Sequence, residues 1–175
     1  MTKVLIIDTS ILCVWLKIPG KETCGTTVDK WDKSRVDHKL KCEIEAGTDL
    51  ILPLAAIVEA GNLICQINGS YRYELAHALE KIVADAADAQ TPWGAFTAQA
   101  SLWDCENLKK LANKWATELV QQNISVGDAT MIALAAYYAE FPGCKVEIFT
   151  GDNRLKAYEP IPPLDIPKRR SQRRS

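Results

Sequence analysis

The chain has 175 residues, of which 47% are hydrophobic and 25% are charged, which predicts one globular domain with a substantial core. The formal net charge is −1, but the last eight residues carry five positive charges and no acid, which leaves −6 on the first 167 residues. No stretch is long and apolar enough for a membrane-spanning helix, so the composition excludes that class. The six cysteines form no C-x-x-C pair and several lie in apolar stretches, which favours a reduced, cytoplasmic protein.

The first fifty residues predict two buried strands separated by two helices. Residues 3–7 form a continuous apolar run rather than an alternating one, which is typical of a strand buried on both faces. A short helix, capped by Thr9 or Ser10, is predicted to follow as far as Leu16. The other elements predicted in this part of the chain are a polar loop at 21–33, a helix at 34–46 and a strand at 49–53.

The rest of the chain is predicted to be mostly helical, with one short strand and one further buried strand. Apolar residues recur at helical spacing from Leu102 to Leu119, which indicates one long helix. The predicted elements are helices at 54–67, 71–89, 98–122, 125–141 and 153–158, a short strand near 94–97 and a buried strand at 145–152. Strands that alternate with helices predict an α/β fold, a three-layer α/β/α sandwich with a central parallel sheet. Residues 1–160 form this domain, and residues 161–175 form a proline-rich exit and a basic tail.

Four acidic residues stand at positions where a core element begins or ends. Asp8 follows the first strand and Asp152 ends the last one, while Glu59 interrupts an apolar helix and Asp128 begins another. In an open parallel sheet, ligands bind beyond the carboxyl ends of the strands. If the first and last strands are neighbours, all four carboxylates converge at that edge.

Each acid also has a purely structural explanation. Asp8 could cap the helix that follows it, and Asp128 forms an S-x-x-D capping box with Ser125. Asp152 lies in T-G-D-N-R, which suits an ordinary turn, and Glu59 could point to solvent. These alternatives are open for each residue taken alone.

Four carboxylates at one place would repel one another unless cations neutralise them. Hard oxygen ligands suit Mg²⁺ or Mn²⁺, and such ions can bind a phosphodiester, activate a water and stabilise the leaving oxygen. The sequence therefore predicts a metal-dependent phosphodiesterase, in which Asp8, Glu59, Asp128 and Asp152 hold the metal. The two histidines, both outside this set, are not needed for that chemistry.

Four motifs, IIDTS, the IVEAGNL helix, SVGDATMIALAA and IFTGDNRL in that order, resemble those of the PIN-domain ribonucleases. The resemblance implies a Rossmann-like topology, an endoribonuclease activity and the same four acids as catalytic, metal-binding residues. It also implies that Ser10 and Thr150 steady the carboxylates or bound water and that Asn153 lies among the supporting polar residues. Residues 17–47 match nothing in the family pattern.

The resemblance, together with the basic tail, extends to partners. RNA is the implied substrate, with Arg154 and the tail as its contacts, although the tail could equally serve solubility alone. The nucleic-acid-binding residues predicted on this basis are Arg154, Lys168, Arg169, Arg170, Arg173 and Arg174. The compact members of the family are toxins, so an antitoxin protein and a homodimer are further implied partners. Two alternatives stay open, an idle PIN-like RNA-binding or scaffold module and a nuclease that acts on DNA.

Overall fold

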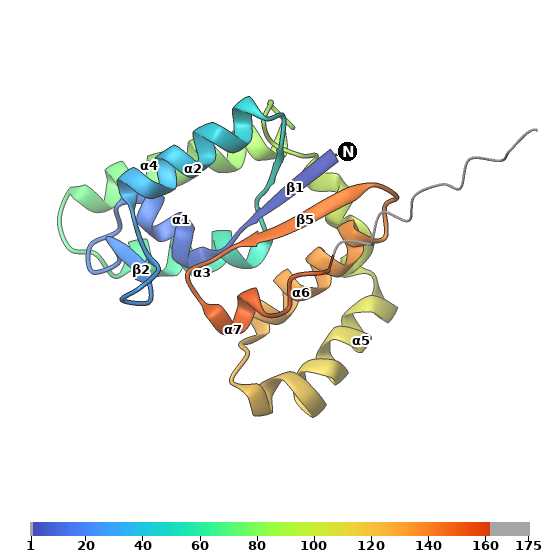
Figure 1. The fold of residues 1–175 in the computed structure, drawn as a ribbon. Coiled ribbons are helices and arrows are strands. Elements are labelled where there is room, and N and C mark those ends of the chain that lie inside the picture. Colours follow the sequence, from blue (N-terminus) through green and yellow to red (C-terminus); the bar gives the residue numbers. More distant parts are fainter. Residues whose placement is uncertain (1, 162–175) are drawn as a thin grey trace, which may run out of the picture.

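A three-stranded parallel sheet forms the centre of the protein (Figure 1). The computed structural model describes residues 2–161, apart from the side chains of residues 96–98 and 101. Strand β1 (Thr2–Ile7) lies between β4 (Asp49–Ile51) and β5 (Cys144–Phe149), and both neighbours run parallel to it. The first and last strands are therefore neighbours, which is the condition on which the expected convergence of the four acids depends. Because all three strands are parallel, their carboxyl ends lie at one edge, where Asp8 follows β1.

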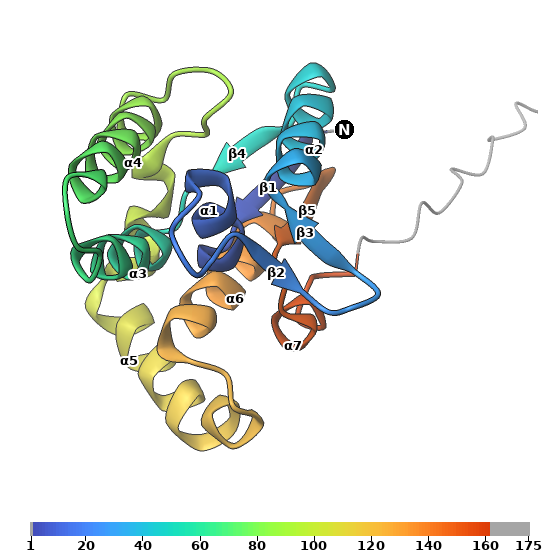
Figure 2. The same cartoon turned by 90° about the vertical axis from the view of Figure 1, so that its left-hand side faces the viewer.

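Helices flank this sheet, so the predicted α/β sandwich is confirmed (Figure 2). They are α1 (Thr9–Leu16), α2 (Lys33–Glu45), α3 (Leu54–Cys65), α4 (Tyr71–Ala87), α5 (Cys105–Lys114), α6 (Val126–Ala139) and α7 (Asn153–Lys156). Helix α2 lies on one side of the sheet and α6 on the other (Figure 2). No helix within residues 2–161 has both the length and the apolar character needed to cross a bilayer. The predicted tail contacts, from Lys168 to Arg174, lie outside the described residues.

Residues 21–33 are more ordered than the predicted loop. They contain an antiparallel hairpin of β2 (Thr23–Gly25) and β3 (Lys30–Asp32), which connects α1 to α2 (Figure 2). Gly25 has a φ of 91°, and a Cβ there would lie 2.1 Å from the carbonyl oxygen of Asp29. The turn therefore requires glycine at this position. A polar sequence without alternation conceals the strands, which are only three residues long each.

Two predictions for the middle of the chain are wrong. No strand forms at 94–97; an isolated bridge joins Leu50 to Trp93, and a 3₁₀ helix spans Phe96–Trp103. The helix predicted over 98–122 is also interrupted, because the side chain of Asp104 caps the start of α5 by accepting from the Asn107 amide at 2.8 Å. After α5 the chain continues as a π turn and a 3₁₀ turn, which end at residue 122. The capping aspartate therefore begins a new helix at Cys105, within a pattern that otherwise predicts one continuous helix.

A network of ion pairs joins α2 to the sheet. The ammonium groups of Lys3 and Lys39 each lie 2.5 Å from Oε1 of Glu43, and both also pair with Glu147 on β5. The hydroxyl of Thr48 donates to Oε2 of Glu43 at 2.7 Å. Burial by itself would raise the pKa of Glu43, but the hydrogen bonds from Lys3, Lys39 and Thr48 outweigh it and lower the pKa to about 2.

Glu43→Gln is expected to remove a pH-dependent part of the stability. Because the folded pKa of about 2 lies below the ordinary 4.5, the ionised carboxylate stabilises the fold above pH 4.5, and this contribution is lost as the pH falls towards 2. At neutral pH the loss should be on the order of 2–3 kcal/mol. Urea unfolding of wild type and variant between pH 2.5 and 7 measures it. Glu45→Gln, on the exposed side of the same helix, is the control and should change stability little. A constant difference across that pH range would contradict the assignment.

Candidate active site

Asp8 lies at the carboxyl end of β1 and is buried, with 5% of its surface exposed. Its amide donates to the carbonyl oxygen of Phe149, the last residue of β5, at 3.0 Å. Its Oδ2 accepts from the hydroxyls of Ser10 at 2.5 Å and Thr150 at 2.8 Å, and from the Ser10 amide at 3.3 Å. Asp8 itself is thus the cap of α1, in place of the predicted Thr9 or Ser10. The capping role leaves Oδ1 without a hydrogen bond from any described residue.

The two small hydroxyl residues connect the ends of β1 and β5. Thr150 Oγ1 donates to Asp8 and accepts from the amide of Asp152 at 2.9 Å. Ser10 Oγ likewise donates to Asp8 and accepts from the amide of Gly151 at 3.2 Å. The two hydroxyls therefore fix Oδ2 of Asp8 between the start of α1 and the loop after β5.

The charge on Asp8 is only partly compensated. Burial raises the pKa of its carboxyl, and the charge of Asp128 raises it further, while the hydrogen bonds from Ser10 and Thr150 act in the opposite direction. The net result is a pKa above the ordinary value. A carboxylate in this position gains stability from a proton or from a cation placed beside it.

Glu59, on α3, contacts the residue after Asp8 and the residue before Asp128. Its Oε2 accepts from the hydroxyl of Thr9 at 2.6 Å. A Cβ at Gly127 would lie 2.1 Å from its Oε1, so the carboxylate rests directly on the glycine that precedes Asp128. The absence of a side chain at Gly127 makes room for Glu59. Neither Thr9 nor Gly127 was predicted as a site residue, although both lie directly beside predicted acids in the motifs DTS and VGD.

Asp128 forms the capping box predicted for α6. Its Oδ2 accepts from the Ser125 amide at 3.1 Å and hydroxyl at 2.8 Å, while that hydroxyl accepts from the Asp128 amide at 3.0 Å. Asp128 is a helix cap and also a member of the site, because its charge raises the pKa of both Asp8 and Arg154. As with Asp8, the cap uses Oδ2 and leaves Oδ1 without a donor among the described residues.

Asp152 caps α7 and is paired with a cation. Its Oδ1 accepts from the Arg154 amide at 2.8 Å and from Nε at 3.2 Å, and its Oδ2 accepts from Nη2 at 2.8 Å. The Arg154 side chain is the main reason why the pKa of Asp152 is lowered. Asn153 begins α7 and is exposed. Asp152 thus differs from the other acids, because both of its oxygens are engaged by protein donors.

The β2–β3 hairpin borders the site, which was not predicted. A Cβ at Gly151 would lie 2.6 Å from the amide nitrogen of Gly25 and 2.7 Å from Sγ of Cys24, so the hairpin rests on the loop after β5. Farther along the hairpin, the Trp31 ring meets Phe149 edge-on, with centroids 4.8 Å apart. Only the single glycines of these two turns, Gly25 and Gly151, could have signalled the contact.

Gly151→Ala is expected to displace the hairpin from the site. The new methyl group would overlap the hairpin backbone, which should cost about 1–3 kcal/mol of stability. Cys24 is half-buried in the wild-type structure. In a background whose exposed cysteines are replaced by serine, Gly151→Ala should make Cys24 react faster with a thiol reagent. Gly61→Ala is the control, since a Cβ there meets nothing within 4 Å and alanine should stabilise α3 slightly. Unchanged thiol reactivity in Gly151→Ala would contradict the proposed contact.

The residues present suit a hard divalent cation in chemistry, since all the charged donors are carboxylates. The structure brings Asp8, Glu59 and Asp128 to one corner of the sheet edge through Thr9 and Gly127. Within the part of the chain that the structure describes, however, no three or more His, Cys, Asp or Glu side chains form a group that could hold a metal ion. Oδ1 of Asp8 and Oδ1 of Asp128 accept no hydrogen bond from a described residue, so these two atoms are available to a cation.

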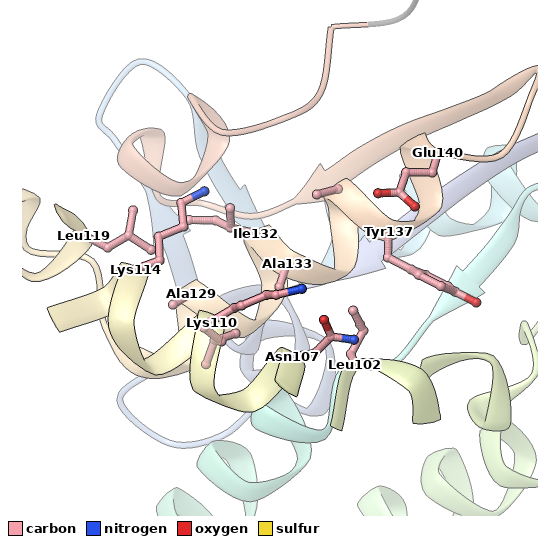
Figure 3. A pocket seen from close by; sticks show the side chains of 12 residues that line it. Leu102, Asn107, Lys110, Lys114, Leu119, Ala129, Ile132, Ala133, Tyr137 and Glu140 are labelled. Carbon is pink, nitrogen blue, oxygen red and sulfur yellow. The ribbon is translucent and has the colours of Figure 1, made fainter. Parts of the chain in front are cut away.

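A separate cavity of about 330 Å³ lies between α5 and α6 (Figure 3). Its lining is largely apolar, with Lys110 and Lys114 contributed by α5, together with Glu140, the residue that caps the end of α6. None of the four predicted acids lines it, so this cavity is distinct from the sheet edge where they lie.

Searches of protein-family models, curated proteins and solved structures found no match to this chain. The resemblance described above therefore rests on the four motifs alone.

Proposed function

We propose that this protein is a divalent-metal-dependent endoribonuclease of PIN-domain type, which hydrolyses RNA phosphodiester bonds at the carboxyl edge of its sheet. One observation carries the proposal: the Glu59 carboxylate bonds Thr9, next to Asp8, and rests on Gly127, next to Asp128. Three acids from three separate elements thereby reach one corner. A structural cap explains Asp8 and Asp128 singly, but it does not explain why a third carboxylate should lie between them.

Mg²⁺ or Mn²⁺ would be held by Asp8, Glu59 and Asp128, with Asp152 as the fourth carboxylate of the same edge. A bound divalent ion supplies two effects, a lower pKa for an attacking water and compensation of the negative charge on the phosphate. Ser10 and Thr150 hold Oδ2 of Asp8, so its Oδ1 is presented in a fixed direction. Ser125 does the same for Asp128.

The proposal assigns no histidine to proton transfer. His77 is exposed and pairs with Glu80, and His38 is exposed on α2 beside Cys42. The groups that can accept a proton from water at the site are therefore the carboxylates. Burial raises the pKa of Asp8, which favours this carboxylate as an acceptor of that proton.

The test uses purified full-length protein with end-labelled single-stranded RNA and a DNA of the same sequence. Cleavage of RNA with Mn²⁺, none with chelator and little cleavage of DNA are expected. Each reaction is repeated with Asp128→Asn, which keeps the shape of the side chain and should be inactive. Cleavage that persists in chelator, or in this variant, would show that a contaminating or different nuclease activity is responsible.

A second candidate is a catalytically idle RNA-binding module. The observation in its favour is that the described side chains include no group of three or more potential ligands that could hold a metal. Calorimetric titration with Mn²⁺ separates the two, because the idle module should release no binding heat that depends on Asp8.

The role of a toxin, with an antitoxin partner, a cytoplasmic RNA target and a homodimeric state, is an extension of the proposal and rests on the resemblance alone. Growth arrest on overexpression, absent with the Asp128→Asn variant, would support it. Harmless overexpression of an active nuclease would count against it.

A further inference from the structure

Arg154 is held in place although it lies on the surface. Its guanidinium donates to both carboxylate oxygens of Asp152, and Nη1 lies 3.5 Å from the carbonyl oxygen of Asn123. Its side chain is nevertheless 59% exposed. A guanidinium has five N–H groups, so at least two are free to bind something else.

The pair is directly connected to the other acids. The hydroxyl of Thr150 bonds Asp8 on one side and the amide of Asp152 on the other. On the opposite side, Asn123 lies two residues before Ser125, the cap of α6, and the charge of Asp128 acts on Arg154. Arg154 therefore lies beside the corner that Asp8 and Asp128 share.

Stability does not explain the pair. An exposed ion pair between residues two apart contributes little to stability, and α7 is a single turn. A planar guanidinium fork, with its orientation already fixed, is by contrast well suited to the oxygens of a phosphodiester. An arginine fixed in advance loses less side-chain entropy when the phosphate binds.

We infer that Asp152 is a positioning residue rather than a metal ligand, and that the guanidinium it orients, that of Arg154, contacts the scissile phosphate of bound RNA. This inference rests on the proposed function. Both oxygens of Asp152 are already engaged, whereas Asp8 and Asp128 each keep one oxygen free. The site would then combine three carboxylates for the cation with one arginine for the phosphate.

The test measures two affinities in full-length protein carrying Asp152→Asn, Arg154→Gln or both. Binding of fluorescein-labelled single-stranded RNA is followed by anisotropy in chelator at about 0.15 M salt, where the tail contributes equally to every variant. Each single variant should bind about tenfold more weakly, and the double variant should be no weaker than Arg154→Gln. Mn²⁺ affinity, measured by calorimetry, should stay within about twofold of wild type in both single variants. Arg72→Gln on α4 is the control for lost positive charge.

The sign of the Asp152→Asn effect is decisive. Removing a negative charge near a phosphate by itself strengthens RNA binding, so weaker binding requires the loss of Arg154 orientation. Stronger binding, or a loss of Mn²⁺ affinity as large as that in Asp8→Asn, would overturn the inference. If wild type itself fails to bind Mn²⁺, the proposed function fails, while the RNA measurements, which need no metal, still decide the role of Asp152.

Discussion

Asp8→Asn is expected to abolish metal-dependent cleavage of RNA while stabilising the metal-free protein. Asparagine keeps an oxygen that can accept from Ser10 and Thr150, and it is as good a helix cap as aspartate. What it removes is a buried negative charge, made costlier by Asp128. The loss of activity should reach at least 10³-fold, because a neutral amide neither neutralises a cation nor accepts a proton.

The stabilisation follows from the direction of the pKa shift. A carboxyl whose folded pKa lies above its ordinary 3.8 destabilises the fold once it is ionised. The gain in Asp8→Asn should therefore be on the order of 1 kcal/mol near neutral pH and disappear below about pH 4. Urea unfolding in chelator at pH 7 and pH 4 measures it.

Two outcomes would contradict this assignment. Full cleavage by Asp8→Asn would falsify the role of Asp8 in the reaction. A variant that is inactive and also strongly destabilised would instead identify Asp8 as a structural cap only. Added Mn²⁺ should raise the midpoint of thermal unfolding of wild type but not of the variant, because a ligand stabilises only the state that binds it.

Thr150→Val should have the second-largest effect and should change the pH dependence of the reaction. Valine has nearly the same shape but donates nothing to Asp8 and accepts nothing from the Asp152 amide. Because the Thr150 hydrogen bond lowers the pKa of Asp8, its loss moves that pKa further upward. The acidic limb of the activity profile should then shift to higher pH.

A hydrogen bond to a charged group contributes about 1.5–3 kcal/mol, so activity at mildly acidic pH should fall about 10- to 100-fold. The measurement is the rate of RNA cleavage between pH 5 and 9 with saturating Mn²⁺. Thr117→Val is the matched control, since its hydroxyl is exposed and donates only to the Asn113 carbonyl oxygen. An equal loss at every pH, without a shift of the acidic limb, would rule out the link to Asp8.

Much of the fold could be predicted because its signals are local. Continuous apolar runs such as Val4–Ile7 correspond to strands that are almost wholly buried, and Gly47, with a φ of 75°, follows α2 where the chain turns. The capping box of Ser125 and Asp128 is equally local, since both hydrogen bonds join residues three apart. Where short-range signals conflicted, as at Asp104 within the predicted long helix, the prediction was wrong.

The features of the candidate site likewise separate into those that could be predicted from the sequence and those that could not. The position of Asp8 after β1 and of Asp152 after β5 could be predicted from strands that end before an acid. The resemblance implies a metal ligand at Asp152, and the pairing of Asp152 with Arg154, two residues further on, was not predicted. Sequence proximity does not reveal which oxygen a neighbouring guanidinium will occupy, because this depends on rotamers set by the surrounding packing.

The sequence by itself determined the three strands of the central sheet, most helices and the presence of acids at their ends, because hydrophobic period and capping act within a few residues. Only the tertiary structure decided which carboxylates share a corner. Glu59 reaches Thr9 across fifty residues of chain, Thr150 reaches Asp8 across 142, and the hairpin closes on Gly151 from the other end of the sequence. Such contacts arise from strand order and from the space left by glycines, and no local pattern encodes either.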